Sequence, residues 1–147
     1  MTSVSHALIG AAIAAKIGNP YLAASTSLVA HFACDAIPHW DLGTNWRSRR
    51  RLITGVLAIL ETLFAITFTF LIFKNFVNPT VLIVSVFFSL LPDWAEVPYY
   101  LLLPNSPKFF HSIYKAQSHF HSKLKYPEGL FTQILVVLLF LFVGFML

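Results

Sequence analysis

Charged residues are scarce in this chain of 147 residues, where they make up only 11% of the sequence. An ordinary soluble domain carries about 25%. With 57% hydrophobic residues, the composition therefore argues against a soluble globular protein and against a disordered one. Cysteine is nearly absent as well, and the single Cys34 excludes a disulfide scaffold. The first residues lack the positive charge of a signal peptide, and His6 interrupts their apolar stretch.

Long apolar runs make up most of what is present, and the mean hydropathy is +0.73. A membrane-spanning helix needs about 20 apolar residues. Five segments approach or exceed this length, at residues 4–17, 21–37, 52–75, 80–103 and 129–147. The first two are short and are joined by the turn Gly18-Asn19-Pro20, so we expect a short N-terminal hairpin. The sequence predicts an all-α, polytopic membrane helical bundle, with residues 1–147 forming a single integral-membrane domain.

Basic residues are distributed unevenly around the apolar segments. If the loop after the second segment is cytoplasmic, only Lys16 and Lys74 fall on the other side of the membrane. The cytoplasmic basic residues are then Arg47, Arg49, Arg50, Arg51, Lys108, Lys115, Lys123 and Lys125. This positive-inside bias predicts a cytoplasmic N-terminus. It also accounts for the net charge of +4, so no nucleic-acid partner is expected. The polar stretch 104–128 is expected to contain a helix at the membrane interface.

Carboxylates are also few, six in all. Four of them lie in or beside the apolar segments, namely Asp35, Asp41, Asp93 and Glu96. Ionisable groups in a membrane segment are costly, so they are usually paired, bind metal or line a water-filled cavity. His6 and His31 lie at equal distances from the first turn, so an antiparallel hairpin puts them side by side.

The other polar residues are expected at a similar depth. Pro38 is predicted to end the second helix, which places His39 and Asp41 directly after its C-terminal end. The segment that contains His119 and His121 is predicted to fold back over them. Imidazole nitrogens and carboxylate oxygens are ligands of zinc, iron and manganese. We therefore predict a centre of roughly one to three divalent metal ions, with ligands from His6, His31, Asp35, His39, Asp41, Asp93, His119 and His121. Glu96 is the predicted catalytic residue, a general base.

Each motif taken alone also has an ordinary structural explanation. His6 is typical of a hydrogen-bonded packing residue, and His31 with Asp35 is typical of a polar clamp between helices. His39 could belong to a helix-end cap. Glu61 has no ionisable neighbour in the sequence, so we expect a structural or pore-facing role for it. The metal-site prediction depends on several such residues converging at one depth.

Three short motifs resemble the YdjM-like family of inner-membrane metal-dependent hydrolases: SHALIG at 5–10, AHFACD at 30–35 and LLPD at 90–93. His121-Ser122 resembles the late His-Ser element of that family. Residues 31–39 are also similar to a zinc-binding stretch of zinc-dependent phospholipase C and the related nucleases. Ala95 and Glu96 depart from the family pattern, which has Asp and His there. The resemblance implies a divalent metal, zinc first, a prokaryotic inner membrane and cleavage of phosphoesters.

Two classes of function are left open. The first is a membrane metal-dependent hydrolase that cleaves a phosphoester of a lipid or other membrane-borne substrate with a metal-activated water. Lys123, Lys125 and the arginine cluster would attract the anionic head groups. The second is a non-catalytic membrane protein, such as a metal or proton transporter with a relay through Glu61, His31 and Asp93, or a small structural subunit.

Overall fold

The computed structural model describes residues 1–44, 48–102, 105 and 107–146, and its regular elements are all helices. In chain order these are α1 (Ser3–Lys16), α2 (Pro20–Asp35), α3 (Arg51–Phe73), α4 (Pro79–Leu102), α5 (Lys108–Phe120) and α6 (Glu128–Met146). The helices α3, α4 and α6 are long and apolar enough to cross a membrane, and α1 is a shorter apolar helix. The predicted all-α membrane helical bundle is therefore confirmed. Arg47 of the basic cluster and residues 103, 104 and 147, at which predicted segments begin or end, lie outside the described residues.

Two Asn-Pro pairs set the starts of α2 and α4. The Asn19 side chain accepts hydrogen bonds from the amides of Tyr21 and Leu22. The Asn78 side chain accepts from the amide of Thr80 at 3.0 Å. A proline follows each asparagine as the first helical residue. This combination satisfies free amide groups at the helix start and fixes φ there, which explains why both turns are tight.

The end of α2 differs from the expectation, because the helix stops at Asp35 and not at Pro38. A proline disfavours helical backbone at the residue before it. Ile37 precedes Pro38, and the helix is lost before this residue. His39 and Asp41 therefore lie on irregular backbone, which can turn them back toward the helix end.

Small residues and hydroxyl groups hold the centre of the bundle together. Helix α1 packs against α2, α3, α4 and α6. A side chain at Gly10 would lie only 3.1 Å from the Ser85 carbonyl oxygen, so the two helices approach closely there. Ser85 and Ser89 donate hydrogen bonds to the carbonyl oxygens of Gly10 and His6, at 2.7 and 2.6 Å. Such contacts are typical of helix pairs in membranes, where close packing replaces the hydrophobic effect.

The outer faces of the long helices are apolar and exposed. On α3, Leu60, Leu63 and Leu71 are exposed, and on α6 so are Leu135 and Leu139. Continuous apolar surface of this kind is unfavourable in water. It is suited to contact with lipid chains.

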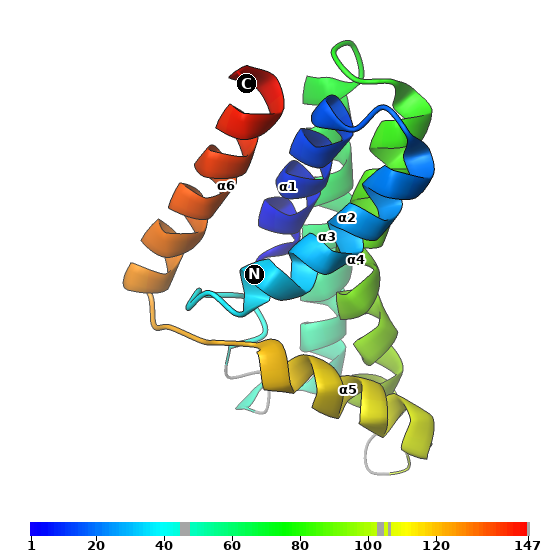
Figure 1. Cartoon of the computed structure of the whole chain (residues 1–147). Helices are drawn as coiled ribbons and strands as arrows, with labels where there is room; N and C mark the ends of the chain where they lie inside the picture. The colour runs from blue at the N-terminus through cyan, green and yellow to red at the C-terminus, as the bar shows by residue number, and fades with distance from the viewer. Residues whose placement is uncertain (45–47, 103–104, 106, 147) are drawn as a thin grey trace.

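The lengths of the helices leave a space at one end of the bundle. At 1.5 Å per residue, α1 has 14 residues and is about 21 Å long, and α2 has 16 residues and is about 24 Å long. Helix α3 has 23 residues and is longer, at about 34 Å. In Figure 1, the turns after α1 and α3 lie at the same end of the bundle, and α5 lies across the opposite end. The lower parts of α3 and α4 thus extend beyond the starting point of α1. The polar stretch contains a helix, as expected, and its position at the membrane interface stays a prediction.

A short backbone pairing ties the segment after α5 to the segment after α2. The His39 amide donates to the Ser122 carbonyl oxygen at 3.1 Å, and the Leu124 amide donates to the His39 carbonyl oxygen at 2.7 Å. The Ser122 amide also donates to the carbonyl oxygen of Asp35 at 2.8 Å. These bonds place His121 beside the end of α2.

Candidate metal centre

Two histidines and a carboxylate from three helices form the first group of potential metal ligands. His6 on α1, His31 on α2 and Asp93 on α4 each offer one ligand atom, and these atoms lie within 4.8 Å of one another. The rings of His6 and His31 are stacked with their centroids 4.0 Å apart. His31 Nε2 lies 3.7 Å from Asp93 Oδ1. The prediction that the hairpin brings the two histidines together is confirmed.

The second group lies where α2 ends and the segment after α5 returns. Asp35, His39 and His121 offer ligand atoms within 4.8 Å of one another. His39 Nε2 is 2.9 Å from His121 Nε2. The latter atom is also 2.7 Å from Asp41 Oδ2. Asp41 therefore contacts this group at its edge without belonging to it, and its role as a metal ligand stays a prediction.

Asp35 belongs to the second group, and its carboxylate also contacts the two histidines of the first group. Its Oδ1 is 3.1 Å from His6 Nε2, and its Oδ2 is 3.5 Å from His31 Nε2. Toward the second group, Oδ1 is 3.7 Å from His39 Nε2 and Oδ2 is 3.7 Å from His121 Nδ1. A carboxylate in this position can share its two oxygens between the groups.

Hydrogen bonds orient two of the imidazole rings. His31 Nδ1 lies 2.8 Å from the Ser89 carbonyl oxygen, and His39 Nδ1 lies 2.7 Å from the Ile37 carbonyl oxygen. A carbonyl oxygen only accepts hydrogen bonds, so Nδ1 carries the proton in both rings. In the neutral rings, the lone pair is then on Nε2, the atom that faces the cluster. Metal-binding histidines are commonly oriented in this way.

Buried polar atoms without partners also support a metal. His31 Nε2 and Asp35 Oδ2 are fully buried and have no hydrogen-bond partner. An unsatisfied buried polar atom costs about 1–3 kcal/mol. The amino group of Met1 contacts Asp35 Oδ1, so the site already attracts a positive charge. The orphaned atoms, the nitrogen and oxygen donors and this attraction fit a divalent metal ion, and the His and Asp groups could hold one.

Asp41 is held in its ionised form. Burial of the carboxyl raises its pKa, but the hydrogen bond with the His121 ring and the charge of Lys123 lower it more, so the pKa lies well below its usual range. Lys123 Nζ is 3.3 Å from Asp41 Oδ2. An ionised carboxylate at this edge adds negative charge that favours a cation.

Gln117 is a contributor that the sequence analysis missed. This residue is buried on α5, a helix that is otherwise mostly exposed. Its Nε2 donates to Asp93 Oδ1 at 2.8 Å, which fixes one oxygen of the carboxylate. The sequence feature that could have indicated this role is its position four residues before the predicted ligand His121. His119 lies on the same helix, but it is exposed and belongs to neither ligand group among the described residues.

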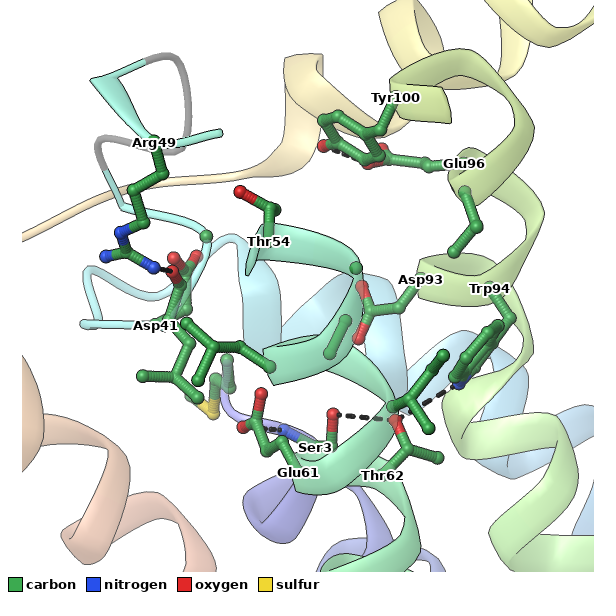
Figure 2. Close-up of a pocket in the computed structure, with 18 of the residues that line it drawn as sticks. Ser3, Asp41, Arg49, Thr54, Glu61, Thr62, Asp93, Trp94, Glu96 and Tyr100 are labelled. Atoms are coloured by element: carbon green, nitrogen blue, oxygen red, sulfur yellow. Dashed lines mark hydrogen bonds between the residues drawn. The ribbon is translucent and has the colours of Figure 1, made fainter. Parts of the chain in front are cut away.

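A cavity of about 200 Å³ lies beside the two groups, in the space that the short helices leave (Figure 2). Asp93, His121 and Asp41 reach its wall, whereas His6 and His31 lie behind them, fully buried. The other polar and charged lining residues are Ser3, Arg49, Arg51, Thr54, Glu61, Thr62, Glu96, Tyr100 and Lys123. A substrate in the cavity would thus meet both the potential metal ligands and basic side chains.

Glu96 and Glu61 are held differently on this wall. Glu96 lies one turn after Asp93 on α4, and its Oε2 accepts a hydrogen bond from the Tyr100 hydroxyl at 2.6 Å. Glu96 belongs to neither ligand group, so its carboxylate is free of those contacts. Glu61 Oε1 accepts from the Ser3 amide at 2.8 Å. Glu61 therefore caps the start of α1, which agrees with a structural role.

Comparisons with known proteins do not extend this picture. No protein-family model, no curated protein and no solved structure matches the chain.

Proposed function

We propose that this chain is an integral-membrane metal-dependent hydrolase that cleaves a phosphoester of a lipid or other membrane-borne substrate. One observation carries the proposal. Imidazole and carboxylate groups, four of them buried, converge from α1, α2, α4 and the segment after α5, and two of their buried atoms, His31 Nε2 and Asp35 Oδ2, have no hydrogen-bond partner. This convergence lies beside a cavity that basic side chains also line.

The chain's own residues have separate tasks in this proposal. His31 and His39 present their Nε2 atoms to the cluster, because backbone carbonyl groups bind Nδ1 and so fix the tautomer of each ring. When bound, a divalent metal supplies a Lewis acid and an activated water. Glu96, whose carboxylate lies on the cavity wall outside both ligand groups, would act as the general base that holds a proton during the reaction. Arg49 and Lys123 attract the phosphate.

Zinc is the proposed metal, because nitrogen and oxygen donors together are its usual ligands outside thiolate sites. The proposed location is a prokaryotic inner membrane, with α5 and the loop after α2 on the cytoplasmic side. The eight-to-two distribution of the basic residues counted in the sequence favours this orientation.

A transporter is less well supported by the distribution of polar groups. Residues 7–15, 20–30, 62–73 and 80–92 contain no acidic, basic or histidine side chain. A proton relay from the cluster toward the turns after α1 and α3 would therefore find no groups to continue it. Glu61, which such a relay would use, is bonded to the Ser3 amide.

The test is metal content followed by activity. The full chain, purified in detergent, should hold tightly bound zinc when measured by elemental analysis. Asp35→Asn should lower the bound metal, because it removes the carboxylate that contacts the histidines of both groups. Glu128→Gln is the matched control, because Glu128 is exposed at the start of α6. It should bind metal like the wild type.

The assay should offer phospholipids, isoprenoid phosphates and soluble phosphodiesters side by side. Cleavage that a chelator abolishes and zinc restores would support the proposal. Cleavage of the soluble esters alone would contradict the lipid assignment. A metal-loaded protein that cleaves no ester, and that carries metal across liposomes, would replace the hydrolase with the transporter.

A further inference from the structure

A second cavity continues from the first into the apolar part of the bundle. It lies between α3 and α4, has a volume of about 450 Å³, and shares Thr62 and Trp94 with the polar cavity. Away from this junction its lining is apolar, with Ile66 and Phe70 on α3 and Ile83 on α4 among the residues. The two cavities therefore meet at one polar boundary.

The junction itself leaves no polar group without a partner. Trp94 Nε1 donates a hydrogen bond to Thr62 Oγ1 at 3.2 Å (Figure 2). Asp93 precedes Trp94 and lines the polar cavity, and it is not among the lining residues of the second cavity. Farther toward the start of α4, residues 80–92 of α4 and 63–73 of α3 contain no acidic, basic or histidine side chain. The second cavity, called the groove from here on, is therefore suited to a hydrocarbon chain and unsuited to a second charged group.

The groove also has the length and the opening that a hydrocarbon chain needs. Ile83 lies ten residues before Asp93 on α4, which corresponds to about 15 Å at 1.5 Å per residue. Ile66, Ile83 and Phe87 line the groove and are each more than 40% exposed. Both helices are long enough to span the membrane, so a chain can enter sideways from the bilayer.

We propose that this groove holds one hydrocarbon chain of a phosphate-bearing lipid whose head lies in the polar cavity. The inference rests on the proposed function and specifies its substrate class. Arg49, Arg51 and Lys123 line the cavity in which the phosphate would lie. Asp93 immediately precedes Trp94 on α4, so the potential metal ligands lie next to the start of the groove. An amphiphile of this kind fills both cavities at once.

Photo-crosslinking tests the inference without relying on turnover. The full chain in liposomes is exposed to dodecylphosphonate that carries a diazirine midway along the chain, and labelled peptides are mapped by mass spectrometry. We expect the label on the groove residues of α3 and α4. The exposed residues Leu135 and Leu139 of α6 should be labelled at least fivefold less. An uncharged dodecyl probe with the same diazirine should lose this preference. Equal labelling of all lipid-facing helices by the phosphonate would overturn the inference.

A matched pair of variants locates the chain more sharply. Ile66→Trp adds bulk inside the groove and should lower groove labelling severalfold. Leu71→Trp adds the same bulk on α3 at an exposed residue that lines neither cavity. It should leave the labelling unchanged. An equal loss in both variants would contradict the groove.

The two proposals fail in different ways. If the protein cleaves a soluble phosphodiester while the phosphonate labels every helix equally, the groove is wrong and a hydrolase remains. If the label collects in the groove while no ester is cleaved, the hydrolase is wrong and the lipid groove remains.

Discussion

Asp35 makes the largest number of contacts with the potential ligands, since its carboxylate approaches all four clustered histidines. Its side chain is fully buried, and a buried carboxylate is stable only when it is paired with positive charge or strong donors. The same residue therefore supplies the charge that attracts a cation and depends on a cation for its own stability.

The role of Glu96 can be separated from metal binding. Glu96→Gln keeps the size of the side chain and removes its ability to accept a proton. Turnover should fall by about 10²–10⁴-fold, the usual contribution of a general base, while elemental analysis finds the metal unchanged. The exposed Glu128→Gln should retain both activity and metal. Loss of the metal together with the activity would make Glu96 a ligand and not a base.

Residues whose partners follow from local spacing were predictable from the sequence. His6 and His31 lie at equal distances from a tight turn, and their rings stack as expected. His119 and His121 could not be told apart, because the difference depends on where α5 ends. The helix ends at Phe120, which leaves His119 on its exposed side and His121 in the segment that pairs with His39. Gln117 was missed for a similar reason, since its partner Asp93 is 24 positions away.

At the scale of the elements, the ends of the five apolar helices were predictable to within two residues, whereas the ends of α5 were not. The Asn-Pro pairs and the changes from apolar to polar sequence mark the starts of α2 and α4. The contact between the start of α6 and the segment after α2 could not be predicted from the sequence. That contact joins elements far apart in the chain, and no local pattern specifies it.

Gly129 allows α6 to start against the segment that carries His39. A methyl group there would lie 2.5 Å from the Trp40 amide nitrogen and 2.8 Å from the His39 carbonyl carbon. Backbone atoms cannot move aside cheaply, so Gly129→Ala should destabilise the fold by about 1–3 kcal/mol. It should also displace His39 and lower the bound metal. Thermal unfolding in detergent, followed by circular dichroism, measures the first effect.

Gly18 provides the control, because a methyl group there meets nothing within 4 Å. Gly18→Ala should change the unfolding free energy by less than about 0.5 kcal/mol, as is usual for an exposed position. Equal melting temperatures for the two variants would mean that α6 does not pack closely against the segment after α2.

At the scale of the whole molecule, polar and basic groups gather at one end of the bundle. The turns after α1 and α3 lie at the other end (Figure 1), where Lys16 and Lys74 are the only basic residues among those that the structure describes. This asymmetry is the physical basis for an orientation in the membrane.

Cysteine labelling tests that orientation. In a Cys34→Ala background, Gly18→Cys and Asn78→Cys should react with a membrane-impermeant maleimide in intact cells. Lys125→Cys, in the segment between α5 and α6, should react only after the membrane is opened. The reverse pattern would place α5 and the metal centre on the outer side.

The ligand groups draw on residues from His6 to His121, and this spread has a consequence for the order in which the protein matures. A chain is synthesised from its N-terminus, and its early elements can associate before the later ones exist. The nascent chain can thus bring His6, His31 and Asp35 together while His121 has not yet been made. An ion captured at that stage would have an incomplete set of donors, and arrival of the segment after α5 would trap it. The newly made protein is therefore expected to exchange metal readily, and the mature protein slowly.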